Sequence, residues 1–248
     1  MRTVVVGASS GLGRCIGIGL GQRGGQVALL ARRKERLQDA AAEAGAGTLV
    51  VECDVTDESS VRSAIDEAAR GLGGIDALVY TPGIGPLKRI ADTDAETWRR
   101  VFDTNVTGAS ITTAAALPHL AESGGCAVYL SSVSGSVTPP WPGLGAYAVS
   151  KAALDKLVDA WRGEHPSVGF TRVTVGDCAG GEGDAMTGFA SEWDFELMAE
   201  VHPLWEARNY MAGALMDVDH LVAMVHAVLE RGGTVSIPSI TVAPRHVK

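Results

Sequence analysis

The sequence predicts an α/β protein with a single, doubly wound parallel sheet of seven strands and helices on both of its faces. Short apolar runs rich in valine, leucine and alanine alternate with longer stretches of helical periodicity from one end of the chain to the other. Such runs are typical of strands that are buried on both faces. No linker, repeat or low-complexity segment interrupts the alternation, so the 248 residues are predicted to form one domain, 1–248.

Composition and charge argue against several classes of protein. Hydrophobic residues make up 46% and charged residues 20%, the balance of an ordinary soluble chain. The net charge is −8 with no basic block, which argues against a nucleic-acid partner, and no apolar run approaches the roughly 20 residues that a membrane span needs. Cys15, Cys53, Cys126 and Cys178 show neither metal nor redox spacing, so we expect reduced thiols, no metal site and a cytoplasmic location.

The first strand is expected at residues 2–6, and the glycine-rich sequence GASSGLG follows it directly. Gly7, Gly11 and Gly13 stand where the chain must turn sharply into a helix and where a phosphate could approach the helix N-terminus. A glycine pattern alone also suits an ordinary tight turn. Its place between the first strand and the first helix is what a dinucleotide-binding fingerprint requires. The loop 7–13, which also contains Ser9, Ser10 and Leu12, is therefore the predicted cofactor loop.

The second strand, 26–31, ends at Ala31 and is followed by Arg32 and Arg33. Enzymes that use the unphosphorylated cofactor carry an acidic residue at this strand end, which accepts a hydrogen bond from the ribose 2′-hydroxyl. A guanidinium suits a 2′-phosphate instead. The sequence therefore favours NADP(H), with a solvated basic start of the helix 33–44 as the alternative interpretation.

The third strand, 48–52, leads into Asp54 and Val55. Thr56 is the expected N-cap of the next helix, which runs to Leu72 and has acidic residues in its first turn, as the helix dipole prefers. Asp54 is either a contact for the cofactor or only a local turn former. The fourth strand is expected at 75–80.

A long helical pattern at 94–120 contains Asn105, a residue type that is mildly unfavourable inside a helix. The fifth strand, 125–132, ends in two serines, and a loop rich in proline and glycine separates it from a helix at 145–162.

Tyr147 and Lys151 stand four residues apart on this last helix and therefore share one of its faces. A nearby ammonium lowers the pKa of a tyrosine, ordinarily near ~10, by roughly 1 to 3 units, towards the pH at which an acid or base works best. A chance Tyr-x-x-x-Lys spacing is the alternative.

The last third of the chain contains a sixth strand at 169–175, a helix at 217–231 and a seventh strand at 234–242. Residues 178–212 lack clear periodicity and are rich in aromatic residues and methionine. They are expected to form either a lid over an apolar substrate or helices packed on the core.

Five motifs occur in the order in which the short-chain dehydrogenase/reductase family has them. They are the glycine turn, Asp54-Val55, the Asn105 to Gly108 segment, the Ser132 to Gly135 segment, and the pair of Tyr147 and Lys151. The chain resembles this family over nearly its whole length. The resemblance implies a Rossmann fold, hydride transfer between NADP(H) and an alcohol or carbonyl of a small, partly apolar substrate, and a homodimer or homotetramer.

The resemblance also implies residue roles. Ser132 would donate a hydrogen bond to the substrate oxygen and Tyr147 would transfer the proton. Lys151 would lower the pKa of Tyr147 and hold the nicotinamide ribose, and Asn105 would fix a relay water. Asp54 and Val55 would contact the adenine.

The chain departs from the family pattern at two places. Tyr80, Thr81 and Pro82 replace the first three residues of an Asn-Asn-Ala-Gly run, so that only Gly83 is kept to let the backbone pass close to the cofactor. After the sixth strand, the usual Pro-Gly is missing, and Thr187 is the nearest candidate for a contact with the nicotinamide carboxamide.

These departures support a second hypothesis, a dinucleotide-binding regulator without turnover. A third is a ketoreductase of carrier-bound 3-oxoacyl groups, which would share the mechanism and differ in substrate.

Overall fold

The computed structural model describes residues 1–181, 186–231 and 235–245 and has one parallel sheet, as predicted. Its strand order is β3-β2-β1-β4-β5-β6-β7. The strands are β1 (Arg2–Val6), β2 (Gln26–Ala31), β3 (Leu49–Glu52), β4 (Ala77–Tyr80), β5 (Cys126–Ser132), β6 (Gly169–Val175) and β7 (Ser239–Val242). The order changes direction between β1 and β4, and in such sheets ligands bind at the carboxyl ends of the strands beside this point.

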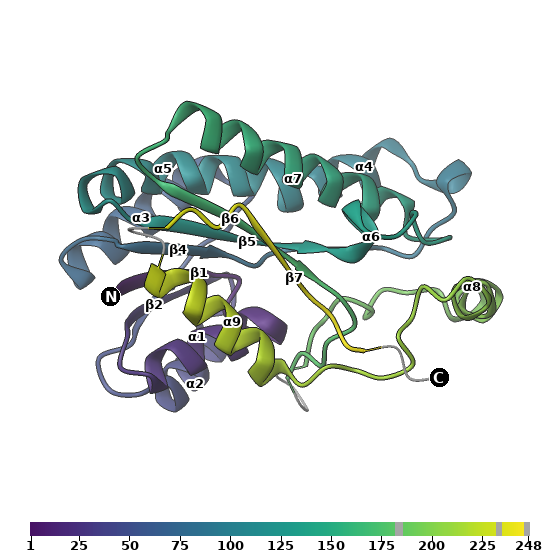
Figure 1. The fold of residues 1–248 in the computed structure, drawn as a ribbon, viewed down its shortest axis with the longest axis horizontal. Helices are drawn as coiled ribbons and strands as arrows, with labels where there is room; N and C mark the ends of the chain where they lie inside the picture. The colour runs from purple at the N-terminus through teal and green to yellow at the C-terminus, as the bar shows by residue number, and fades with distance from the viewer. Residues whose placement is uncertain (182–185, 232–234, 246–248) are drawn as a thin grey trace.

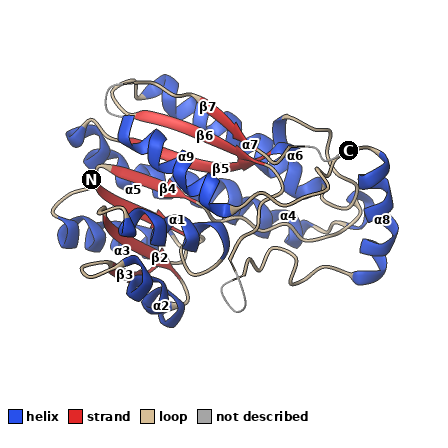
Figure 2. Ribbon diagram, turned by 60° about the horizontal axis from the view of Figure 1, so that its bottom comes forward, coloured by secondary structure: helices blue, strands red, loops and turns tan. Residues whose placement is uncertain are grey.

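Helices cover both faces of the sheet (Figures 1 and 2). One face carries α1 (Gly11–Gln22), α2 (Lys34–Ala44) and α9 (Val218–Arg231), and the other carries α3 (Glu58–Leu72), α5 (Gly108–Ser123) and α7 (Gly145–Glu164). Three further helices, α4 (Ala95–Phe102), α6 (Val133–Ser136) and α8 (Phe195–Ala207), stand near the carboxyl ends of the strands. Within the part of the chain that the structure describes, no helix is both long and apolar enough to cross a bilayer.

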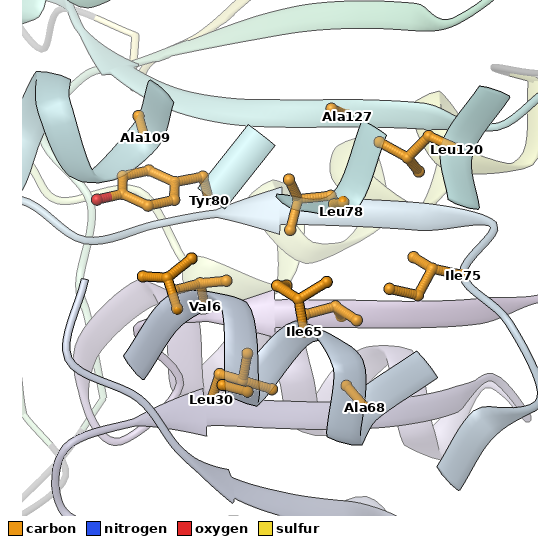
Figure 3. Packing of buried hydrophobic residues seen from close by; sticks show 14 of the residues in the cluster. Val6, Leu30, Ile65, Ala68, Ile75, Leu78, Tyr80, Ala109, Leu120 and Ala127 are labelled. Atoms are coloured by element: carbon orange, nitrogen blue, oxygen red, sulfur yellow. The ribbon is translucent and has the colours of Figure 1, made fainter. Parts of the chain in front are cut away.

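The alternation of side chains along each strand produces two separate cores. Val4 and Val6 pack with α3 and α5, whereas Val5 between them packs with α1 and α9 on the opposite face. Figure 3 shows the first core, in which Ile65 of α3 and Leu78 of β4 are fully buried. Burial on both faces explains why the strands have continuous apolar sequences.

Several predicted boundaries differ from the structure by one or more residues, among them the starts of α3, β4 and β7. Asp57, not Thr56, is the N-cap of α3, because its carboxylate accepts hydrogen bonds from the backbone N–H groups of Ser59 and Ser60, whereas the Thr56 hydroxyl donates to Asp54. The fourth strand begins two residues later than expected. The seventh strand begins at Ser239, directly after a proline that has no N–H for the ladder, and residues 232–234 lie outside the described part of the chain.

The expected helix at 94–120 is divided. A single π-helical turn, η2 (Asp103–Thr107), stands between α4 and α5, and Asn105 lies at its centre. Such turns insert a wider loop of backbone into an α-helix and occur frequently at functional sites.

Candidate active site

The loop between β1 and α1 is shaped by glycines. Gly7 and Gly11 have φ values of 84° and 59°, which side chains rarely tolerate. A Cβ on Gly13 would stand 2.6 Å from the Gly7 carbonyl oxygen. Among the residues that the structure describes, no side chain caps the N-terminus of α1, and its first turn contains no acidic residue, so its partial positive charge can act on an anion.

Arg33 extends this positive site. Its guanidinium donates to the hydroxyls of Ser9 and Ser10, with Nη2 at 2.8 Å from each oxygen. Burial, followed by the charges of Arg36 and Arg32, lowers the pKa of Arg33. Of the two predicted arginines, the structure therefore brings Arg33 to the loop. Arg32 contributes only the effect of its positive charge on the pKa of Arg33. The charge of Arg36 has the same effect on Arg33, which was not predicted. The place of Arg36 in the basic first turn of α2 was the signal that could have indicated it.

The other predicted cofactor residues are Thr187 and Gly83, which lie beside site residues, and Asp54 and Val55, which have local structural contacts. Thr187 lies against the loop, since its Cβ is 3.1 Å from the position that a Cβ on Gly11 would take. Gly83 lies beside the Lys151 ammonium, 3.2 Å from the corresponding Cβ position. Asp54 forms a local turn, in which its carboxylate accepts hydrogen bonds from the backbone N–H and the hydroxyl of Thr56, and Val55 is buried.

Ser132 and Tyr147 meet at the end of β5. Because successive strand residues point to opposite faces, Ser131 buries its hydroxyl without a partner among the described residues, while Ser132 points to α7. The Ser132 hydroxyl caps α6 by accepting from the Ser134 N–H and makes a hydrogen bond of 3.0 Å with the Ser134 hydroxyl, and it stands near enough to the Tyr147 phenol to lower its pKa. Gly135 allows α6 to pack closely against α7, because a Cβ at this position would lie 3.0 Å from the Cβ of Lys151.

The expected effect of Lys151 on Tyr147 is wrong for this structure. Burial raises the pKa of Tyr147 to about 12, and the hydrogen bond with Ser132 acts in the opposite direction. Lys151 lies over the tyrosine ring, with Nζ 5.8 Å from the ring centroid, and donates to the Leu130 carbonyl at 2.7 Å. Its positive charge is therefore directed to a backbone carbonyl and not to the phenol oxygen.

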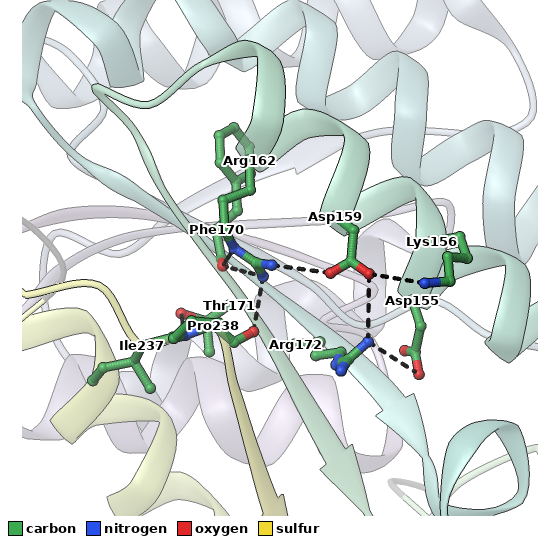
Figure 4. Close-up of polar contacts among 9 residues, drawn as sticks. All are labelled: Asp155, Lys156, Asp159, Arg162, Phe170, Thr171, Arg172, Ile237 and Pro238. Carbon is green, nitrogen blue, oxygen red and sulfur yellow. Dashed lines mark hydrogen bonds and ion pairs between the residues drawn. The ribbon is translucent and has the colours of Figure 1, made fainter.

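Lys151 is itself strongly perturbed. It is only 3% exposed, and burial lowers its pKa to about 8, while the carboxylate of Asp155 opposes this shift. Asp155 stands one turn further along α7, is also buried, and has its nearest countercharge in Arg172 at 3.8 Å (Figure 4). An ammonium with a pKa near 8 can both hold and release a proton close to neutral pH.

Asn105 links three segments of the site. Its side-chain amide donates to the Ile84 carbonyl at 2.9 Å and to the Ser150 hydroxyl at 2.8 Å, and its carbonyl oxygen accepts from the Ile84 N–H at 2.8 Å. Ser150 in turn donates to the Tyr147 carbonyl at 2.7 Å. The network fixes the first turn of α7, and Ser150, which was missed, could have been found from its place between Tyr147 and Lys151.

An aromatic cover lies over this group, made by Trp141, Phe189, Trp193, Trp205 and Tyr210. The Phe189 ring packs edge-on against Tyr147, with centroids 4.9 Å apart, and the Trp193 indole donates to the Gly85 carbonyl at 2.8 Å.

Two ion pairs join the cover to the body of the protein, Arg100 with Glu192 and Arg89 with Glu200. Within residues 178–212, α8 packs on Trp141 and Phe189 packs against Tyr147, while a lid over an apolar substrate stays a prediction. Residues 182–185 lie outside the described chain.

Residues 2–193 match the family model described as short chain dehydrogenase. The chain belongs to the short-chain dehydrogenase family. This short-chain dehydrogenase is 37% identical over 176 residues to glycine betaine reductase ATRR of Emericella nidulans, covering 69% of this chain and 14% of that protein. It is 34% identical over 179 residues to 11-beta-hydroxysteroid dehydrogenase A of Sesamum indicum, covering 70% of this chain and 51% of that protein.

A solved structure agrees with this assignment. A short-chain type dehydrogenase/reductase from Mycobacterium marinum has a TM-score of 0.81 at 28% identity, covering 98% of this chain and 93% of that one. The chain spans about half or less of the length of the two relatives named above. As a short-chain dehydrogenase it belongs to a family of oxidoreductases that bind a nicotinamide dinucleotide.

Proposed function

We propose that this protein is an NADP(H)-dependent oxidoreductase that interconverts an alcohol and a carbonyl on a small, partly apolar substrate. The observation that carries the proposal is that Ser132, Tyr147 and the buried ammonium of Lys151 stand together, with Lys151 Nζ 5.8 Å from the tyrosine ring centroid and Ser132 near enough to the phenol to act on its pKa. Two hydroxyls that converge on one point, beside a group able to supply a proton, suit the polarisation and protonation of a carbonyl oxygen.

The residues present fit a dinucleotide with a 2′-phosphate. The glycine loop before α1 leaves room for a phosphate to approach the helix N-terminus, because a Cβ on Gly13 would collide with the Gly7 carbonyl. The guanidinium of Arg33 stands beside this loop, and a guanidinium pairs well with phosphate oxygens. Lys151 and Gly83 would lie beside the nicotinamide ribose, and Thr187, which is predicted to contact the nicotinamide carboxamide, lies against the glycine loop at Gly11.

In the reductive direction Ser132 donates a hydrogen bond to the substrate oxygen, where negative charge develops. Tyr147, whose raised pKa keeps its proton on the phenol at neutral pH, gives that proton to the same oxygen. When bound, NADPH supplies the hydride for the carbonyl carbon. Lys151, with its pKa near 8 and its ammonium bonded to the Leu130 carbonyl, can resupply the proton by way of an intervening hydroxyl or water, and Asn105 keeps Tyr147 in place through Ser150.

The aromatic cover supports an apolar substrate. Phe189 packs edge-on against Tyr147 and Trp193 packs against Phe189, so a substrate that approaches the phenol from this side would contact aromatic rings. The name of the sesame relative refers to a hydroxysteroid, a largely apolar alcohol, which agrees with this chemistry. From the family we also propose a homodimer or homotetramer located in the cytoplasm.

The experiment follows NADPH oxidation by absorbance against a panel of aldehydes, ketones and a carrier-bound 3-oxoacyl group. We expect turnover of at least one apolar carbonyl, and a loss of about 10²-fold or more in Tyr147→Phe, the scale of general acid catalysis. NADPH binding, measured by its fluorescence, should change less than twofold in this variant, because the ring that packs on Phe189 is kept. Near-normal turnover in Tyr147→Phe would refute the role of the phenol.

The same panel separates the alternatives. Binding of NADPH without turnover of any carbonyl would favour a regulator that has kept the fold. Turnover of the carrier-bound group alone would identify a ketoreductase.

A further inference from the structure

We propose that Tyr80 is a positioning residue of this active site, which acts through a hydrogen bond that holds the π-helical turn bearing Asn105. By the resemblance to the family, Tyr80 stands at the first position of the Asn-Asn-Ala-Gly run, and its phenol bonds to Thr104, a residue to which no role in the reaction is assigned above. The proposal rests on the function proposed above in one respect only, since its effect on turnover requires that Asn105 and Tyr147 act in a reaction.

Tyr80 is the last residue of β4 and is 1% exposed. Its phenol donates to the Thr104 carbonyl with a distance of 2.6 Å between the oxygens. Figure 3 shows the ring at the end of β4, between Ala109 of α5 above it and Val6 below it. Gly108 makes this reach possible, because a Cβ at that position would stand 2.6 Å from the phenol oxygen.

The π-helical turn explains why a donor is needed at this carbonyl. In an uninterrupted α-helix the Gly108 N–H would donate to the Thr104 carbonyl. Here it donates to the Asp103 carbonyl, one residue earlier. The Thr104 carbonyl thus loses its regular helical donor in a buried place, where leaving an acceptor unpaired is costly, and the Tyr80 hydroxyl supplies the hydrogen bond.

The next residue in the turn is Asn105, whose side chain is bonded to both backbone groups of Ile84. The segment 80–84 therefore holds the turn at two points, from Tyr80 to the Thr104 carbonyl and from Ile84 to Asn105. From Asn105 the connection continues through Ser150 to the first turn of α7. Burial raises the pKa of Tyr80 well above its ordinary value, so the phenol remains a donor over the whole working range of pH.

The chain offers a matched control in Tyr129. This residue stands directly opposite Tyr80 in the β4–β5 ladder, is equally buried, and also bonds a helix residue, with 2.7 Å between its phenol oxygen and the Thr113 hydroxyl. Thr113 lies on α5, beyond the π-helical turn, and has no bond to Asn105. Tyr80→Phe and Tyr129→Phe thus remove the same atom from the same environment, and only the first one touches the turn.

Two measurements test the proposal. Amide hydrogen exchange is expected to speed up about tenfold at residues 103–108 and at Ile84 in Tyr80→Phe, but not in Tyr129→Phe. Steady-state kinetics are expected to show a kcat about tenfold lower in Tyr80→Phe with the KM for NADPH within twofold, while Tyr129→Phe keeps its kcat. Thermal melting shows that both variants are folded and how much stability each one loses.

Unchanged exchange at the turn in Tyr80→Phe would overturn the proposal, and so would a normal kcat, or an equal loss of kcat in both variants. The exchange measurement needs no substrate. If the wild type turned over no carbonyl, the proposed function would fail, while exchange would still decide whether Tyr80 holds the turn.

Discussion

Replacing Arg33 with alanine should convert the protein from a preference for NADPH to indifference between NADPH and NADH. The guanidinium stands between two serine hydroxyls at the entrance of the glycine loop, with its Nη2 at 2.8 Å from both oxygens. It carries its charge in a partly buried position beside Arg36 and Arg32, and burial is the main reason that its pKa is lowered. A doubly charged phosphate placed there would relieve this crowding of positive charge.

The expected change in the KM for NADPH follows from the contact between the Arg33 guanidinium and the 2′-phosphate that would be lost. A hydrogen bond to a charged group contributes about 1.5 to 3 kcal/mol, and each 1.4 kcal/mol is about a factor of ten in binding. Because Arg33 is exposed as a residue and its guanidinium is only partly buried, we assign it the lower half of this range for its whole contact with the phosphate. The KM for NADPH should therefore rise about 10- to 40-fold in Arg33→Ala, and the KM for NADH should change less than threefold.

The assay measures kcat/KM for both cofactors at one fixed carbonyl concentration, at low and at high salt. Arg32→Ala is the matched control, since it removes the same charge from the adjacent position, where the side chain is exposed and makes no hydrogen bond to Ser9 or Ser10 among those described. The wild-type preference for NADPH should decline with ionic strength, as a charge interaction near the surface does. Equal losses of kcat/KM for the two cofactors in Arg33→Ala, or a larger loss for NADPH in Arg32→Ala, would show that Arg33 does not select the cofactor through its 2′-phosphate.

Two further predictions concern stability. Burial lowers the pKa of Lys151 from 10.5 to about 8, so between these values the unfolded chain binds the proton that the folded chain releases, and stability rises with pH over this window. Lys151→Met should lack this rise. The free energy of unfolding of the wild type, measured by urea denaturation, should therefore increase relative to that of Lys151→Met by about 3 kcal/mol from pH 8 to 10.5. A constant difference between the two would contradict the assigned burial. Gly13→Ala should cost about 1–3 kcal/mol, because the added Cβ would stand 2.6 Å from the Gly7 oxygen. Gly163→Ala, with nothing within 4 Å of its Cβ, should be neutral or stabilising, and equal effects of the two substitutions would show that helix propensity and not crowding is measured.

The arrangement of strands and helices could be predicted because it depends on local patterns. Each strand is an apolar run, and the sharing of one helix face by Tyr147 and Lys151 follows from helical periodicity alone. The choice of Ser132 over Ser131 relied on the resemblance to the family, and alternation along β5 gives the physical reason for it.

Other features depend on contacts between distant segments and left little local signal, apart from the mildly unfavourable Asn105 inside the helical pattern at 94–120. The pKa of Tyr147 is set by how deeply the ring is buried and by where the Lys151 ammonium points, and neither can be obtained from a spacing of four residues. The π-helical turn interrupts a sequence whose periodicity continues across it. Whether Arg32 or Arg33 turns towards the glycine loop is decided at a junction of strand and helix, where neither period applies.

The aromatic cover has a consequence for how this protein could acquire new substrates. Ser132, Tyr147 and Lys151 are held by β5 and α7, whereas Phe189, Trp193 and Trp205 come from the insertion between β6 and α9. Apart from Trp141, which precedes α7, the cover is thus encoded in a different stretch of the chain from the proposed catalytic residues. Exchange of the insertion for another of similar length should alter which substrates are accepted more than it alters the positions of Ser132, Tyr147 and Lys151.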